Sequence, residues 1–204
     1  MKVTRYFQSC LLIEDGPSRL LIDPSGQEAE RLADFGKLDA VIYTHEHVDH
    51  FDPALAQQLS ANGAKLYANA STAKQMKSAP TIVEDGQEFE VGGLKVKAME
   101  LPHCLMVDGS ASVQNTGYLV GGKLFHPGDG KELAGLNVDV LAVPLNGPDI
   151  SLHDAYLFAM QVGAKQVVPI HYDYLGGNPD FLARSLDQKG VKTHALELGQ
   201  SADL

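Results

Sequence analysis

The stretch Thr44-His45-Glu46-His47-Val48-Asp49-His50 decides how the fold and the chemistry of this chain are interpreted. It follows residues 40–44, a short apolar run that is typical of a buried strand. It precedes Asp52-Pro53, which favours the start of a helix because Asp caps helices and Pro suits their first position. The stretch therefore predicts a loop between a strand and a helix that holds three histidines.

The spacing within this loop favours metal binding. His45 and His47 are two residues apart, so in an extended chain their side chains point the same way, whereas Glu46 points away and is excluded as a ligand. Imidazole nitrogens are good ligands for divalent metals. Asp49 and His50 follow where the chain must turn into the helix, which allows them to face a second metal about 4 Å from the first.

Three further candidate ligands share one placement along the chain. Each lies just beyond a predicted strand, and loops at strand ends commonly carry function on a rigid scaffold. They are His103 after residues 94–101, Asp129 after residues 123–125, and His171 after residues 166–170. Because strand ends can converge at one edge of a sheet, we expect these side chains to meet the histidine loop.

The composition is that of an acidic globular protein. The chain has 204 residues, of which 44% are hydrophobic and 21% charged, and its formal net charge is −10. We expect a single domain over residues 1–204, because no linker or repeat divides it. An acidic chain without a basic block disfavours nucleic-acid binding, and the absence of a long apolar run disfavours membrane insertion. We expect a small-molecule substrate.

Cysteine usage and the first residues favour a cytoplasmic location. Cys10 and Cys104 are too few for a disulfide framework, so we expect two reduced thiols. The apolar stretch near the N-terminus ends at Glu14 and is too short for a secretory signal.

Periodicity and turn residues predict both strands and helices, without regular alternation. We expect strands at residues 6–13, 19–22, 40–44, 65–68, 89–91, 94–101, 117–120, 123–125, 139–143, 166–170 and 192–196, and helices at 28–35, 53–61, 71–78, 152–162 and 179–189. Hairpins at residues 89–101 and 117–125 argue against a purely parallel sheet. The pattern favours an α+β fold of packed sheets with helices outside.

The order His-x-His-x-Asp-His, then His, Asp and His, resembles the metallo-β-lactamase superfamily. Residues 115–118 and 164–172 resemble its branch of metal-dependent hydrolases that includes ascorbate-6-phosphate lactonase. The resemblance implies an αββα sandwich of four layers with a two-metal site at one edge. It places His45, His47 and His103 on one metal, Asp49, His50 and His171 on the other, and Asp129 between them.

The resemblance also implies a mechanism. Two divalent ions, zinc or alternatively manganese or iron, hold a bridging hydroxide that attacks a small ester, lactone or phosphoester, as catalytic zinc sites do. Asp49 orients this nucleophile and accepts its proton. Gly130 departs from the family pattern, because many relatives have Thr or Ser there, whose hydroxyl steadies the preceding carboxylate.

Other polar residues and other functions are weighed lower. We expect structural or solvent-exposed roles, with substrate contact as the alternative, for His126, His153, Asn146, Tyr172, Tyr174 and Lys131, a non-ligand role for Cys104, and none for His194. Alternative functions are a metal-dependent nuclease or phosphodiesterase, a di-iron redox protein, and a non-catalytic metal-binding module. The redox alternative is disfavoured because His47 stands where the related flavodiiron proteins have Glu.

Overall fold

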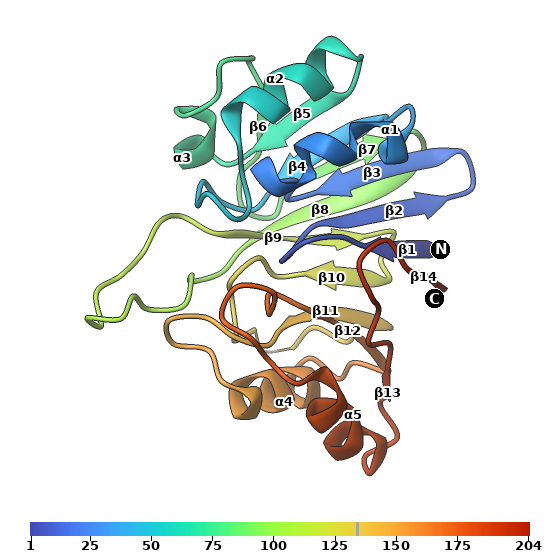
Figure 1. Cartoon of the computed structure of the whole chain (residues 1–204), viewed down its shortest axis with the longest axis vertical. Coiled ribbons are helices and arrows are strands. Elements are labelled where there is room, and N and C mark those ends of the chain that lie inside the picture. Colours follow the sequence, from blue (N-terminus) through green and yellow to red (C-terminus); the bar gives the residue numbers. More distant parts are fainter. Residues whose placement is uncertain (134) are drawn as a thin grey trace.

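The computed structural model describes residues 1–133 and 135–204. Two seven-stranded mixed sheets pack face to face, and helices cover their outer faces (Figure 1). One sheet has the order β14-β1-β2-β3-β4-β5-β6 and the other β13-β12-β11-β10-β9-β8-β7. The α+β fold with the αββα arrangement expected from the sequence is therefore confirmed.

The elements of the first sheet come from the N-terminal part of the chain and from its last residues. The strands are β1 (Lys2–Arg5), β2 (Leu11–Asp15), β3 (Ser18–Ile22), β4 (Ala40–Tyr43), β5 (Lys65–Ala68), β6 (Thr81–Ile82) and β14 (Ser201–Asp203). The helices are the 3-10 helix η1 (Gly26–Arg31), α1 (Leu32–Phe35), α2 (Pro53–Ala61) and α3 (Ala70–Ala73).

The second sheet takes the rest of the chain. Its strands are β7 (Glu88–Val91), β8 (Leu94–Glu100), β9 (Thr116–Val120), β10 (Leu124–His126), β11 (Val140–Pro144), β12 (Gln166–Ile170) and β13 (Lys192–Thr193). Its helices are α4 (Leu152–Gln161) and α5 (Pro179–Asp187). Among the described residues, no helix is long and apolar enough to cross a membrane.

Alternation along the strands produces the four layers. In β4, Ala40 and Ile42 belong to the core between the sheets, whereas Val41 and Tyr43 pack against α1 and α2 on the outer face. In β11, Val140 likewise faces the inter-sheet core. Both faces of these strands are buried, which explains why they are continuous apolar runs.

Strand direction explains where the site forms. In the second sheet, β8 and β10 are both antiparallel to β9, and β11 and β12 run parallel to β10. The C-terminal ends of β8, β10, β11 and β12 therefore share one edge. This edge lies on the left of Figure 1, beside the end of β4, and the long loop after β8 projects from it.

Several sequence predictions need correction. The apolar run at residues 6–13 is not one strand, because Tyr6 and Cys10 close a turn through a hydrogen bond from Tyr6 N to Cys10 O at 2.8 Å. The predicted helix at residues 28–35 divides into the end of the 3-10 helix η1 and the α-helix α1, and that at 71–78 is only α3. The strand predicted at 192–196 ends at Thr193. Strands β1, β6 and β14 were not predicted.

Candidate metal centre

The structure brings all seven predicted ligands together at the shared edge of the two sheets. They form two groups, and within each group the candidate ligand atoms all lie within 4.8 Å of one another. One group is His45, His47, His103 and Asp129, and the other is Asp49, His50 and His171. The same division, with Asp129 counted in the first group, is the one that the family resemblance implies for two metals; that these residues bind metal stays a prediction.

Local hydrogen bonds shape the histidine loop. The backbone amides of His50 and Phe51 both donate to His47 O at 2.9 Å, which turns the chain sharply. The Asp52 carboxylate caps α2 by accepting from Leu55 N at 2.6 Å, and Pro53 is the first helical residue, as the sequence predicted. The turn points Asp49 and His50 to the second group.

A glycine lets the Asp129 loop approach the histidine loop. Gly128 has φ +60°, and a Cβ there would lie 2.2 Å from Oδ1 of Asn115 and 2.8 Å from Cβ of Thr44. Asn115 in turn donates to Pro127 O at 2.9 Å and accepts from Asp129 N at 3.3 Å. Any larger residue at position 128 would displace the Asp129 carboxylate from the centre.

Asp129 lies between the two groups. Its Oδ2 is 3.4 Å from Nε2 of His103 and 4.0 Å from Nε2 of His45. Its Oδ1 is 3.1 Å from Nε2 of His50 and 3.4 Å from Nε2 of His171. Each carboxylate oxygen therefore faces a different group, which is the geometry that a bridging ligand requires.

Four buried polar atoms of the described residues at this point make no well-oriented hydrogen bond, although two of them, Nε2 of His50 and Oδ1 of Asp129, lie 3.1 Å apart. They are Nε2 of His45, His50 and His103, and Oδ1 of Asp129. Buried polar atoms in proteins are normally paired, so a cluster of unpaired ones facing a common point needs an explanation. Divalent metals accept both imidazole nitrogen and carboxylate oxygen, so this donor set fits two such ions.

The other nitrogen of each imidazole contacts a partner outside the cluster. Such partners fix the tautomer and orientation of a metal-binding histidine. They are Oγ1 of Thr44 for His45 (3.0 Å), Oγ of Ser112 for His47 (3.4 Å), Oδ2 of Asp23 for His50 (2.9 Å), Cys104 O for His103 (2.6 Å) and Asn146 O for His171 (2.6 Å).

Sequence reasoning missed Asp23, although a signal existed. This fully buried carboxylate follows β3, just as the predicted ligands follow their strands. It accepts hydrogen bonds from Thr44 N at 2.7 Å and Thr44 Oγ1 at 2.6 Å, besides its contact with His50. Asp23 therefore joins the end of β3 to the start of the histidine loop.

Burial and neighbouring charges shift the pKa values of the histidines in the cluster in different directions. Burial lowers the pKa of His45 and His47, with neighbouring histidines adding to the effect. Burial also acts to lower the pKa of His50, but the charges of Asp129 and Asp23 overcome it and raise that pKa well above its usual value. The pKa of His171 is likewise raised, because the charge of Asp129 outweighs burial.

The two carboxylates of the cluster shift in the opposite direction. Burial acts to raise the pKa of Asp129, but the neighbouring His171 and His50 hold it well below its usual range. The pKa of Asp49 is also lowered, because its hydrogen bond with His171 and the charge of His50 outweigh burial. Both carboxylates are therefore ionised and ready to act as ligands at neutral pH.

Gln8 was also missed, and it contacts both the second group and the loop that carries His171. Its Nε2 donates to Oδ2 of Asp49 at 3.2 Å, and its Oε1 accepts from the backbone amides of Asp173 at 2.8 Å and Tyr174 at 3.2 Å. Its carbonyl accepts from His171 N at 2.9 Å. Gln8 and His171 both have positive φ angles, +53° and +57°, so hydrogen bonds hold two strained residues together.

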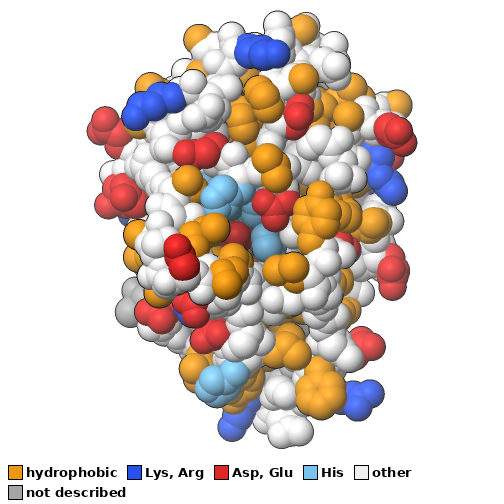
Figure 2. All heavy atoms as spheres, turned by 60° about the vertical axis from the view of Figure 1, so that its left-hand side comes forward, with side chains coloured by type: hydrophobic (Ala, Val, Ile, Leu, Met, Phe, Trp, Pro, Cys, Tyr) orange, Lys and Arg blue, Asp and Glu red, His pale blue; other side chains and the backbone are white. Residues whose placement is uncertain are grey.

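A cavity of about 460 Å³ opens over part of each group, since Asp49 and His171 of the second group and His47 and His103 of the first line it. In Figure 2 the central histidines lie in a hollow bordered by apolar side chains, while Lys and Arg lie towards the periphery. The lining residues are Gln8, His47, Val48, Asp49, His103, Met106, Pro148, His171, Tyr174 and Leu175.

Most of the residues for which we expected a structural role make contacts that fit such a role. His126 is buried, with Nε2 2.8 Å from Ser9 O and Nδ1 accepting from Gly128 N. The Asn146 side chain binds the carbonyls of Leu175 and Gly176, so it serves the turn rather than an oxyanion. Tyr172 packs under the guanidinium of Arg5.

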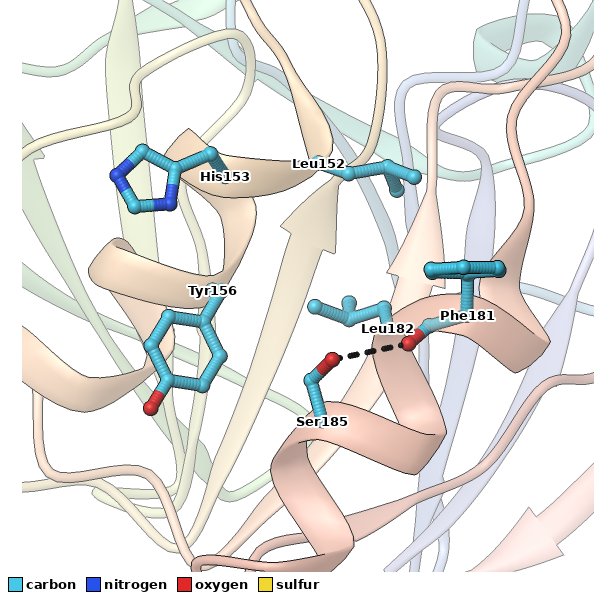
Figure 3. A pocket seen from close by; sticks show the side chains of 6 residues that line it. All are labelled: Leu152, His153, Tyr156, Phe181, Leu182 and Ser185. Atoms are coloured by element: carbon cyan, nitrogen blue, oxygen red, sulfur yellow. Dashed lines mark hydrogen bonds between the residues drawn. The ribbon is translucent and has the colours of Figure 1, made fainter.

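Four other side chains also lie outside the cavity. His153 is exposed on α4 beside a separate pocket between α4 and α5 that Tyr156, Phe181 and Ser185 help to line (Figure 3). Lys131 is not freely exposed as expected, because it pairs with Asp149 at 2.9 Å. Glu46 accepts from the hydroxyls of Ser71 and Thr72, so it points away from the cluster. His194 contacts Gln166.

Steric crowding explains why residue 130, directly after Asp129, is a glycine in this chain. A Cβ at Gly130 would lie 2.3 Å from Cδ1 of Leu101 and 2.7 Å from its Cγ. A Thr or Ser at this position would therefore require Leu101 to move. Cys104, also near the cluster, is buried, and burial raises the pKa of its thiol to about 12.

Comparisons with known proteins agree with this arrangement. A family model described as the beta-lactamase superfamily domain matches residues 2–171. The chain is 35% identical over 180 residues to protein Rv0786c of Mycobacterium tuberculosis, with 84% of each chain covered. It is 29% identical over 224 residues to a UPF0173 metal-dependent hydrolase of Rubrobacter xylanophilus, covering 93% of this chain and 90% of the relative. Among solved structures it is similar to Igni18, a metallo hydrolase from Ignicoccus hospitalis, with a TM-score of 0.80, 22% identity, and 98% and 97% of the two chains covered.

Proposed function

The chain belongs to the beta-lactamase superfamily and is a metal-dependent hydrolase, and on this premise we propose that it cleaves a small ester, lactone or phosphoester with two divalent metal ions. The observation that carries the proposal is the cluster of unpaired, buried donor atoms around Asp129. The two carboxylate oxygens of Asp129 face the two separate ligand groups.

The two ligand groups assign residues to two ions. We propose that His45, His47 and His103 hold one ion, that Asp49, His50 and His171 hold the other, and that Asp129 contacts both. Five imidazoles and two carboxylates suit zinc, and also manganese or iron. We further propose that residues 1–204 act as one hydrolase domain, because the ligands come from loops of both sheets.

Two bound divalent ions supply a hydroxide nucleophile near neutral pH and polarise the oxygen that gains charge during hydrolysis. The residues of the chain fix where this happens. Asp49 lines the cavity, and its Oδ2 is held by Gln8, which leaves the carboxylate placed to orient the nucleophile and to accept its proton. Asp23 and the carbonyls of Cys104 and Asn146 hold three of the imidazoles in fixed orientations.

The nuclease alternative gains no support from the site. A nuclease contacts phosphates through basic side chains, and the described residues that line the cavity include neither Lys nor Arg. The similarity to the branch of ascorbate-6-phosphate lactonase stays a prediction, as does the cytoplasmic location.

The test combines metal analysis with turnover. We expect the purified protein to hold two divalent ions and to hydrolyse at least one member of a panel of esters, lactones and phosphodiesters, with activity lost on chelation. His47→Ala should lose one ion and most of the activity, whereas His153→Ala, a change of the same residue type on exposed α4, should leave both unchanged. A folded, metal-loaded protein that hydrolyses no member of the panel would refute the proposal.

A further inference from the structure

The walls of the cavity point to the chemical class of the substrate. We propose that the substrate is an uncharged ester or lactone with a hydrocarbon substituent, which the apolar wall formed by Val48, Met106, Pro148, Tyr174 and Leu175 binds beside the metal centre. This inference rests on the proposed hydrolase function and narrows it, since it excludes phosphorylated and carboxylated substrates.

Exposure of the wall is the first observation. Val48 lies between two candidate ligands and is 84% exposed, Leu175 is 63% exposed, and Tyr174 is 53% exposed. Leu105 and Val107, on either side of Met106, are exposed as well. Isolated exposed apolar residues are ordinary, but a contiguous apolar patch around a concave site marks a binding surface.

The wall is held in place by specific contacts. The ring of Tyr174 packs edge-on against Phe7 with centroids 4.9 Å apart, and its hydroxyl accepts from Nε2 of Gln27 at 3.2 Å. Leu175 O and Gly176 O both accept from the Asn146 side chain, at 3.1 and 2.7 Å. Because Asn146 O also contacts His171, one residue fixes both a candidate metal ligand and the adjoining wall.

The distribution of charge excludes an anionic substituent. Among the described residues that line the cavity, and apart from the histidines, Asp49 is the only side chain with a charge at neutral pH. Arg5, which lies behind the His171 loop, is 2% exposed and already paired with Asp173 at 2.5 Å. A carboxylate or phosphate at the end of the substituent away from the two ions would lose its hydration against apolar side chains without gaining a cationic side chain.

The reaction on such a substrate balances without a further reactant. Water adds to the acyl carbon, the bond from that carbon to the alcohol oxygen breaks, and the proton ends on the departing oxygen. The products are a carboxylic acid and an alcohol, or one hydroxy acid from a lactone. The hydrocarbon substituent takes no part in the reaction, so the wall determines specificity.

A matched pair of substrates tests the inference with the zinc-loaded protein. Para-nitrophenyl hexanoate and mono-para-nitrophenyl adipate have acyl chains of equal length and differ by a terminal carboxylate. We expect kcat/KM to be at least about tenfold higher for the hexanoate ester. Leu175→Lys should reduce this preference about tenfold, whereas Phe181→Lys, at a 62% exposed position on α5, should leave it unchanged.

A binding measurement separates this inference from the proposed function. Saturation-transfer NMR should detect binding of hexanamide but not of the equally long adipic acid monoamide, and Leu175→Lys should remove this difference. If no ester is hydrolysed but hexanamide binds in this way, the hydrolase function fails and the inference about the cavity stands. Turnover or binding that favours the anionic member of either pair overturns the inference. So does self-association, measured by light scattering, that Leu175→Lys abolishes, because the wall would then be an interface between copies.

Discussion

Replacing Gln8 by Met removes a set of hydrogen bonds that the structure concentrates at one side chain. The carboxamide of Gln8 makes three shorter ones, to Asp49, Asp173 and Tyr174, besides a longer contact of 3.5 Å with Nε2 of His171. At about 1 kcal/mol for each bond, the loss amounts to about 3 kcal/mol. For a chain of this length, 3 kcal/mol corresponds to a fall in Tm of roughly 6 to 12 °C.

The assay is thermal unfolding in the presence of a chelator, so that metal binding does not contribute to the measured Tm. Gln27→Met is the matched control, because Gln27 makes one exposed hydrogen bond to Tyr174 and its loss should cost less than about 0.5 kcal/mol. After reloading, Gln8→Met should also hold its second ion less tightly. If both variants melt at the same temperature and retain two ions with equal affinity, Gln8 does not position the loop that carries His171.

Four further outcomes follow from the site. Loading the metal-stripped protein with zinc at neutral pH should release protons, measured with a pH indicator, because imidazole binds a metal only in its neutral form and the pKa values of His50 and His171 are raised in the stripped protein; no release would contradict this. The raised pKa values of His50 and His171 also make the stability of the metal-stripped protein depend on pH. The contribution of their positive charges is complete below about pH 6.5, the ordinary histidine pKa, and is lost as the pH rises through the raised pKa values. The Tm of the metal-stripped protein should therefore fall at alkaline pH. Asp23→Asn should weaken metal binding by the His50 group about 10- to 100-fold in a chelator competition, and unchanged affinity would show that Asp23 does not orient His50. Gly130→Ser should destabilise the protein by about 1–3 kcal/mol in urea unfolding, and adding Leu101→Ala should recover part of this loss; equal stabilities would show that Leu101 moves freely.

The sequence located the candidate ligands because each depends on local signals. An apolar run predicts a strand, and a histidine or aspartate directly after it predicts a side chain at the sheet edge. Asp52-Pro53 predicted the start of α2 for the same kind of reason, since capping depends on neighbouring residues alone. Asp23 was within reach of this reasoning, because it follows β3 in the same way.

Features that depend on distant contacts were not predictable. Residues 6–13 have the apolar content of a strand, yet Gln8 adopts a positive φ that its own side chain does not favour. Contacts with Asp49, Asp173 and Tyr174, far away in the sequence, stabilise it there. The apolar wall also combines separate loops, and a valine or leucine in a loop does not reveal by itself what it borders.

The groups that orient the candidate metal-binding histidines differ in how many amino-acid substitutions they tolerate. His103 and His171 are oriented by backbone carbonyls, which every amino acid provides, so many substitutions at Cys104 can accumulate without disturbing the imidazole. His50 is oriented by a carboxylate, which only a narrow choice of residues can replace. Substitutions are therefore tolerated at the positions that orient His103 and His171, whereas few are tolerated at Asp23, which orients His50. Directed evolution can change the most residues around the ligands that come from the second sheet.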